Sequence, residues 1–271
     1  NMHQSFSILT IVIALIAGAV SLIGISLVKE GKHIDHTKES KISMVDIFNM
    51  IRTNKPLLIS TLVSVFHGFV WTLVAATTTY YIKWAYCTDL ETGVVDNGKF
   101  GSMAMILGIC QLVPSIVMAA LSPRFVKWFK GPVPVFKLAM WLELIGGLGL
   151  FAGMALGVLN SSPALFFACL TILLIGSGLS FVPGTLIGIE CMDYGMYKTG
   201  KEMHGIVNAV GRFIAKAQTA LSSVVVGGIL VSIGYHVDSV TDTYLGDLAD
   251  IPRMLYSFIV VCGLVPAVLC L

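Results

Sequence analysis

Residues 204–230 read HGIVNAVGRFIAKAQTALSSVVVGGIL, an apolar run that contains an arginine, Arg212, and a lysine, Lys216. The run is long enough to cross a bilayer as a helix, which takes about 20 residues. Arg212 and Lys216 are four positions apart and therefore share one face of that helix. At ~1.5 Å per residue from Gly205, they lie about 10 Å and about 16 Å into the span. Ionised side chains are costly at this depth, so the stretch predicts a membrane helix that lines a polar path.

The rest of the chain has the same membrane character. Of its 271 residues, 56% are hydrophobic and 12% are charged, whereas a soluble domain carries about 25% charged residues. Apolar runs long enough to span a bilayer are expected at about residues 7–28, 57–82, 101–122, 138–159, 164–189, 205–233 and 252–271. The sequence therefore predicts an all-α integral membrane protein with seven spans. The six cysteines show no CxxC pair or regular spacing, which argues against a structural disulfide or metal site.

The lysines and arginines outside the spans are divided unequally between alternate loops. The loops at 29–56, 123–137 and 190–204 hold twelve of the 17, and the alternate loops hold only Lys83, Lys99 and Arg253. Loops rich in Lys and Arg stay on the cytoplasmic side of a membrane. The three basic loops are therefore predicted to be cytoplasmic.

The long loop at 29–56 is the clearest boundary in the chain. Its second half, MVDIFNMIRTNKP (44–56), has apolar residues spaced for a short amphipathic helix on the membrane surface. Both ends of the sequence look cut, so we interpret the chain as part of a longer protein built from two bundles of six helices. Residues 1–28 are then the last helix of the amino-terminal bundle, 29–56 the central cytoplasmic loop, and 57–271 the six-helix carboxyl-terminal bundle.

Two of the predicted spans carry a stripe of polar side chains. In 205–233 the stripe is Asn208, Arg212, Lys216, Thr219 and Ser223, and in 57–82 it is Ser60, Ser64, His67, Trp71, Ala75 and Thr78. Aromatic rings in a polar cavity are common platforms for sugar rings, so Trp71 is a candidate substrate contact, with packing as the alternative. His67 is a candidate site residue, with a hydrogen bond inside the bundle as the alternative. Glu143 is interpreted as an interface residue that extends towards the cytoplasmic headgroups rather than as a proton carrier.

Two roles remain open for Arg212 and Lys216. One is an interhelical salt bridge without a part in transport. Against it, the like charges repel each other at this spacing, and no acid is expected at comparable depth in the other six spans. The alternative places their counter-anions on helices outside this chain or on a ligand.

Several motifs resemble one known family. They are RTNKPLL (52–58), SPRFVKWFK (122–130), IECMDYGMYKTGK (189–201), GRFIAKAQTA (211–220) and GGILVSIGY (227–235). They are similar to the glycoside–pentoside–hexuronide:cation symporters, which include melibiose permease and belong to the major facilitator superfamily. The resemblance implies two six-helix bundles, with a sugar bound between them and moved by alternating access. It also implies coupling to Na⁺ or H⁺, a plasma-membrane location and no cofactor.

The resemblance further implies roles for single residues. Lys216 matches a lysine that organises the cation and sugar sites by pairing with acids of the amino-terminal bundle. Phe181 falls where melibiose permease has an aromatic residue near the sugar. Two positions depart from the pattern: Met196 replaces an acid of melibiose permease, and Glu202 replaces an arginine found in many members. The candidate cytoplasmic gate residues are Glu190, Asp193, Tyr194, Lys198, Lys201 and Arg124.

Three other functions compete with sugar transport. A seven-helix receptor with a retinal-type lysine would place that lysine on the last span, whereas Lys216 is on the sixth. A membrane-embedded hydrolase is disfavoured because the chain contains no HExxH or GxSxG motif. A major facilitator carrier of a lipid or a drug would keep the fold and change only the substrate. No nucleic-acid partner is expected.

Overall fold

The computed structural model describes residues 2–27, 54–200, 204–238, 241, 243–265 and 268. Helix α1 (Met2–Leu27) belongs to one compact unit, and the other described helices belong to a second. Taken by itself, α1 exposes apolar side chains on all sides from residue 10 to its end. Such a helix is typical of a membrane span, in which lipid or other helices replace water.

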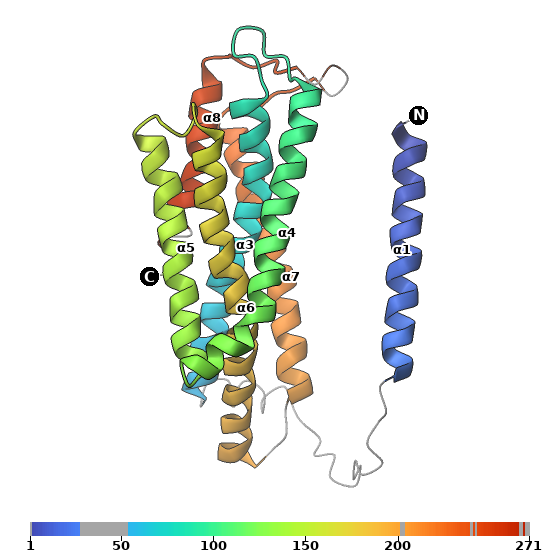
Figure 1. Ribbon diagram of the computed structural model, residues 1–271, viewed down its shortest axis with the longest axis vertical. Coiled ribbons are helices and arrows are strands. Elements are labelled where there is room, and N and C mark those ends of the chain that lie inside the picture. The colour runs from blue at the N-terminus through green and yellow to red at the C-terminus, as the bar shows by residue number, and fades with distance from the viewer. Residues whose placement is uncertain are drawn as a thin grey trace. The chain divides into compact units, whose positions relative to one another are not determined.

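The second unit is a bundle of antiparallel helices (Figure 1). Its members are α3 (Lys55–Tyr86), α4 (Asn97–Trp128), α5 (Pro132–Ala155), α6 (Pro163–Thr199), α7 (His204–Ser232), α8 (Asp250–Ile259) and a π-helical turn, η2 (Val260–Leu264). Helix α6 packs against α3, α4 and α5, and α7 packs mainly against α3. The polar stripes predicted on 57–82 and 205–233 therefore belong to neighbouring helices.

Local sequence explains where several of these helices begin and end. The Asn54 side chain accepts a hydrogen bond from the Leu57 N–H at 3.1 Å and caps α3, which has a proline in its first turn. The Asn54 amide also donates to the Cys191 carbonyl at 2.8 Å, which fixes the start of α3 against α6. Asp96 caps α4 in the same way. Helix α6 ends at Gly200, whose φ of 69° suits glycine.

Helices α5 and α6 approach closely because glycines lie at their contact. A Cβ added at Gly146 would lie 2.5 Å from the Leu173 backbone nitrogen. One added at Gly176 would lie 2.6 Å from the Ala139 carbonyl oxygen. Between membrane helices, where the hydrophobic effect is weak, such close backbone packing supplies much of the association energy.

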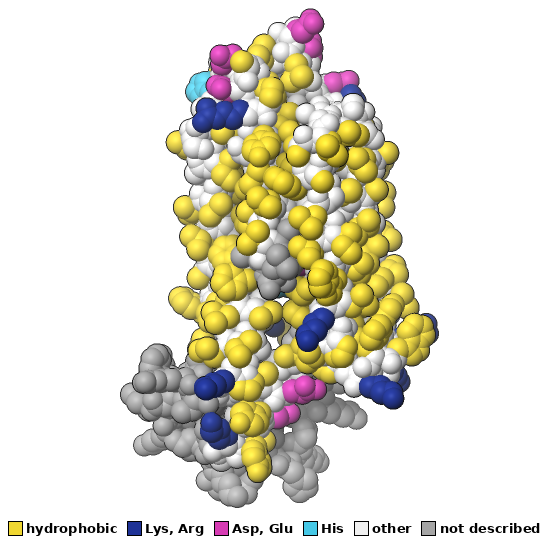
Figure 2. All heavy atoms as spheres, turned by 90° about the vertical axis from the view of Figure 1, so that its left-hand side faces the viewer, with side chains coloured by type: hydrophobic (Ala, Val, Ile, Leu, Met, Phe, Trp, Pro, Cys, Tyr) yellow, Lys and Arg dark blue, Asp and Glu magenta, His cyan; other side chains and the backbone are white. Residues whose placement is uncertain are grey.

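The two ends of the bundle differ in structure and in charge. At one end, the loop after α3 and the loop after α7 are joined by a β-bridge between Val94 and Thr243. Beneath them lies an aromatic cluster in which the Tyr81 and Phe166 rings stack at 4.9 Å. Figure 2 shows acidic side chains gathered at this end, most Lys and Arg side chains at the other, and apolar side chains between. This arrangement matches the loop alternation predicted from the Lys and Arg distribution.

The structure corrects several predicted helix boundaries and does not confirm the count of seven. Among the residues that the structure describes, six helices are long and apolar enough to cross a membrane, namely α1 and α3–α7. In the described part of the seventh candidate, 252–271, the structure has α8 followed by the π-turn η2. The predicted loops 123–137 and 190–204 are much shorter, because α4 ends at Trp128, α5 begins at Pro132 and α6 continues to Thr199. The surface helix predicted within 44–56 lies almost wholly outside the described residues.

Candidate functional site

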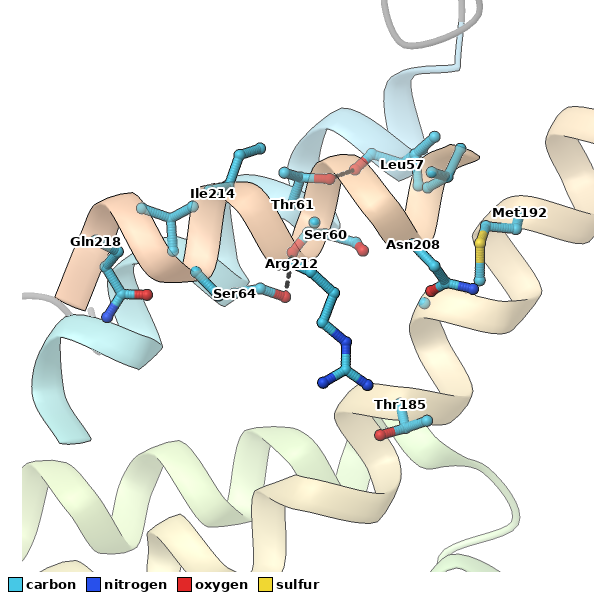
Figure 3. Close-up of a pocket in the computed structure, with 15 residues that line it drawn as sticks. Leu57, Ser60, Thr61, Ser64, Thr185, Met192, Asn208, Arg212, Ile214 and Gln218 are labelled. Atoms are coloured by element: carbon cyan, nitrogen blue, oxygen red, sulfur yellow. Dashed lines mark hydrogen bonds between the residues drawn. The ribbon is translucent and has the colours of Figure 1, made fainter. Parts of the chain in front are cut away.

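A cavity of about 480 Å³ lies between α3, α6 and α7 (Figure 3). Its walls combine hydroxyl and amide side chains with one guanidinium group and small or apolar residues. The lining residues are Leu57, Ser60, Thr61, Ser64, Val65, Thr185, Gly188, Met192, Val207, Asn208, Gly211, Arg212, Ile214, Ala215 and Gln218. A concave site with a few polar groups in an apolar wall is typical of small-molecule binding.

Arg212 is the charged group of this cavity. Figure 3 shows its guanidinium group extending from α7 towards Thr185 on α6, with Asn208 one turn earlier near Met192. Arg212 makes no ion pair or hydrogen bond with any residue that the structure describes. Its five N–H donors are therefore available to an acceptor inside the cavity, and their planar fork suits a carboxylate or a pair of hydroxyl oxygens.

A hydroxyl–amide network between α3 and α7 sets the rotation of α7. The Thr72 and Ser222 hydroxyls are 2.7 Å apart, and the Gln218 amide donates to Thr72 at 3.5 Å. Gln218 and Ser222 are buried, and the Gln218 amide packs where a side chain at Gly68 would stand. The polar stripe of α7 consequently lies beside this contact rather than within it. Gln218 and Ser222 were not among the residues predicted from the sequence, although their spacing of four residues marks a second polar face.

This rotation divides the predicted stripe of α7. Asn208 and Arg212 line the cavity, whereas Lys216 and Thr219 are exposed beside it and are not among the lining residues. The Thr219 hydroxyl donates to the Ala215 carbonyl of its own helix at 3.0 Å. Lys216 makes no ion pair or hydrogen bond with a described residue, so the structure supplies no interhelical salt bridge for either cation within the described part of the chain.

Two candidate aromatic residues lie together next to the lining of the cavity. The rings of Trp71 on α3 and Phe181 on α6 meet edge to face, with centroids 6.2 Å apart. Phe181 is half exposed, so one side of its ring is open. Along their helices, Trp71 comes two turns after Ser64 and Phe181 one turn before Thr185, which places the pair next to the polar lining.

His67 and Glu143 form a pair inside the bundle, in which Glu143 is buried and His67 partly buried, and this corrects the prediction for Glu143. The Glu143 side chain is 0% exposed and its Oε1 lies 2.8 Å from His67 Nε2, so it does not extend to the headgroups. The error came from the predicted start of the span at residue 138, because α5 begins at Pro132 and Glu143 is near its middle. For His67, the structure shows the hydrogen bond inside the bundle that was the alternative to a role in the site.

The candidate gate residues lie on helices rather than in loops. Four of them are exposed on the last three turns of α6, namely Glu190, Asp193, Tyr194 and Lys198. Arg124 is exposed near the end of α4. Because α6 ends at Thr199, Glu190 is not in the last turn, where the helix dipole would disfavour an acid most. Lys201 lies outside the described residues.

The sequence as a whole is similar to one known family of proteins. The sequence pattern of the family described as MFS/sugar transport protein matches residues 1–271. A curated relative, "Uncharacterized symporter YnaJ" of Bacillus subtilis (strain 168), is 26% identical over 258 residues, which cover 95% of this chain and 50% of that protein. The chain therefore spans about half the length of that relative. With its membrane-spanning helices and this match over its whole length, the chain is a multi-pass membrane protein that belongs to the MFS/sugar transport protein family.

Proposed function

We propose that the protein is a secondary active transporter that carries a sugar, glycoside or hexuronide together with Na⁺ or H⁺ by alternating access. The observation that supports this most directly is the cavity with Arg212 and Asn208 on one side and serine and threonine hydroxyls on the other. The edge-to-face pair of Trp71 and Phe181 lies beside it. The relative named a symporter agrees with coupled transport.

The chemistry of the cavity suits such a substrate. A sugar presents many hydroxyl groups, each of which needs a hydrogen-bond partner once water is removed. Asn208, Thr185 and Ser64 offer donors and acceptors from three helices. The faces of sugar rings carry C–H groups that pack on aromatic rings, and the guanidinium group can bind a uronate carboxylate in a bidentate manner.

In this proposal the cavity is completed by the other six-helix bundle of the intact transporter in the plasma membrane. Carboxylates on that bundle or on the substrate pair with Lys216 and Arg212. The basic ends of α4 and α6, with the acids Glu190 and Asp193, form the contacts that close the cytoplasmic side. Alternating access then consists of opening and closing the cavity between the bundles.

The test is uptake of labelled glycosides and hexuronides into membrane vesicles that contain the intact transporter, with and without Na⁺ and proton gradients. Arg212→Gln should weaken the apparent affinity for a transported sugar by about 10-fold or more, because a charged hydrogen-bond partner is lost. Arg253→Gln, at the start of α8 and away from the cavity, is the matched control and should leave the affinity unchanged. Uptake of a lipid or an amphiphilic drug with no uptake of any sugar would instead support the alternative major facilitator carrier.

A further inference from the structure

Glu143 and His67 form an ionisable pair in the interior of the bundle that the proposed function does not use. Counted from the starts of their helices at ~1.5 Å per residue, Glu143 lies about 17 Å and His67 about 18 Å along the axis. Because the hydrocarbon core is about 30 Å thick, both lie near its middle. Buried acids at this depth are rare and are usually functional.

The hydrogen bonds around the pair assign a proton to His67 Nε2. The Ser180 hydroxyl donates to the Ser177 carbonyl at 2.6 Å, so its oxygen is left to accept from His67 at 3.2 Å. The Nε2–H group is thus shared between Ser180 and Oε1 of Glu143, which lies at 2.8 Å. The other ring nitrogen, Nδ1, makes no hydrogen bond to a described residue.

The two members of the pair differ in their access to solvent. The His67 side chain is 17% exposed and that of Glu143 is 0% exposed. His67 is one turn beyond Ser64, which lines the cavity, and Ser180 is just over one turn before Thr185, which lines it from α6. Ser64 also lines a second cavity, between α3, α5 and α6, and the His67 ring meets Phe136 of that cavity edge to face, with centroids 6.0 Å apart. His67 is the exposed member of the pair beside both cavities, so a proton from either one would reach the imidazole ring before the carboxylate.

Other ionisable groups on the packed helices are separated from the pair along the helix axes. On α5, Lys137 is ~9 Å from Glu143, and on α6, Glu190 is ~15 Å beyond Ser180, both at ~1.5 Å per residue. The guanidinium group of Arg212 extends into the cavity towards Thr185, which is just over one helical turn beyond Ser180 on α6 (Figure 3). The other ionisable groups on the surrounding elements are Lys55, Tyr80, Tyr81, Lys83 and Tyr86 on α3; Lys99, Cys110, Arg124 and Lys127 on α4; Lys137 on α5; Cys169, Glu190, Cys191, Asp193, Tyr194, Tyr197 and Lys198 on α6; His204, Arg212 and Lys216 on α7; and Cys262 on η2.

We propose that Glu143 and His67 form a proton-binding site that exchanges with the substrate cavity through the His67 ring. With Nε2–H donated to Glu143, an incoming proton binds at Nδ1 and gives an imidazolium–carboxylate pair with no net charge. Transfer of the Nε2 proton to Oε1 would give a carboxylic acid beside a neutral ring with the same number of protons. Loss of the Nδ1 proton leaves one negative charge, on the buried Glu143 carboxylate. This charge is disfavoured until a cation or water enters the cavity next to the pair. Protonation is thereby linked to occupancy of the cavity.

This inference rests on the proposed function only for that link, because the proton site itself needs no substrate. Three variants separate titration from packing. Glu143→Gln keeps an oxygen that accepts from Nε2–H but removes the counter-charge of the imidazolium. His67→Gln keeps an N–H donor towards Glu143 but removes the Nδ1 atom that binds the incoming proton. Ser180→Ala removes the second acceptor and no titratable group, so it is the matched control.

The first measurement is infrared absorption of the purified intact transporter as the pH varies between about 5 and 9, the range in which histidine changes charge. We expect a one-proton change in the carboxyl and imidazole bands of the wild type and of Ser180→Ala. The change should be absent in Glu143→Gln and in His67→Gln. A wild-type change that persists in Glu143→Gln, or no change in the wild type, would overturn the proton site. If one glutamine variant does not fold, the other still decides the question.

The second measurement is sugar binding across the same pH range. Linkage to one proton changes the apparent affinity by up to about tenfold per pH unit, and this dependence should be lost in both glutamine variants. Wild-type binding that is independent of pH would overturn the link to the cavity, even where the infrared change is as expected. If no sugar binds to the wild type, the proposed function fails, and the infrared titration still decides the proton site.

Discussion

Arg212 and Lys216 have the same charge and share one helix, yet the structure places them in different surroundings. Arg212 extends into the cavity, whereas Lys216, one turn further along α7, is exposed at its side. The cause is the contact of Gln218 and Ser222 with Thr72. This contact turns towards α3 the face of α7 that carries Gln218 and Ser222, next to the stripe that carries Arg212 and Lys216. In the proposed function, Arg212 acts on the substrate and Lys216 acts on carboxylates from outside this bundle.

Replacement of Lys216 tests this division at the scale of one residue. Lys216→Ala in the intact transporter should abolish the stimulation of sugar uptake by Na⁺ or H⁺, because in the proposed function the lysine holds the carboxylates of the cation site in place. Protein level and insertion should remain unchanged, since Lys216 makes no bond with a described residue. The measurement is uptake with and without each cation gradient. Ser223→Ala, on the same stripe and hydrogen-bonded to its own helix at 3.2 Å, is the control. Wild-type cation stimulation in Lys216→Ala would mean that its charge is structural.

At the scale of elements, the bundle depends on close helix contacts, and the contact of α5 with α6 is the most extensive. Gly146→Ala should lower the free energy of unfolding by about 1–3 kcal/mol, because the new methyl group would overlap the Leu173 backbone, which cannot move aside cheaply. Thermal unfolding of the detergent-purified protein measures the loss. Gly108→Ala on α4 has open space around the added Cβ and should be neutral or slightly stabilising. Equal effects of both variants would show that the α5–α6 contact is not tight.

The turn after α3 should respond to acid. Hydrogen bonds from the Glu91 N–H and the Thr92 hydroxyl hold the pKa of the Asp89 carboxyl below its ordinary value. The charged carboxylate therefore stabilises the turn above the pKa of the unfolded state, and this contribution is lost as the pH falls through the lowered pKa. Hydrogen exchange of the Gly93 amide, which donates to the Asp89 carbonyl at 2.8 Å, should lose protection in acid after correction for intrinsic exchange. Asp89→Asn keeps an acceptor oxygen without a charge, so its protection should not vary over this range.

At the scale of the whole molecule, the orientation in the membrane is the main prediction from charge. Lys127→Cys, at the basic end of α4, should react with an impermeant thiol reagent only from the cytoplasm. Glu91→Cys, at the opposite end of the bundle, should react only from outside. The unsubstituted protein controls for native cysteines, and labelling of both variants from the same side would contradict the topology.

Sequence alone determined the helical membrane class, the positions of α1 and α3–α7 and the family. Hydropathy and the bias of Lys and Arg between loops are sums over many residues, so errors at single positions cancel. Helix ends were predicted less well, because hydropathy registers only the apolar part of a span. Helices α4 and α6 continue for several polar residues beyond it, to Trp128 and Thr199. In the candidate site, the periodicity of α7 was enough to predict Arg212 and Asn208 on a polar face.

Only the tertiary structure decided which polar groups meet. Glu143 and His67 are 76 residues apart in the chain and come together through the packing of α3 against α5 and α6. Whether an intramembrane acid reaches headgroups or a histidine on another helix depends on helix rotation and on an axial offset of one or two turns. The sequence pattern of one helix contains no information on either quantity. The same holds for Lys216, whose place beside the cavity follows from the contact of Gln218 and Ser222 with Thr72. Side chains on the partner helix α3 determine which of the two polar faces of α7 is buried.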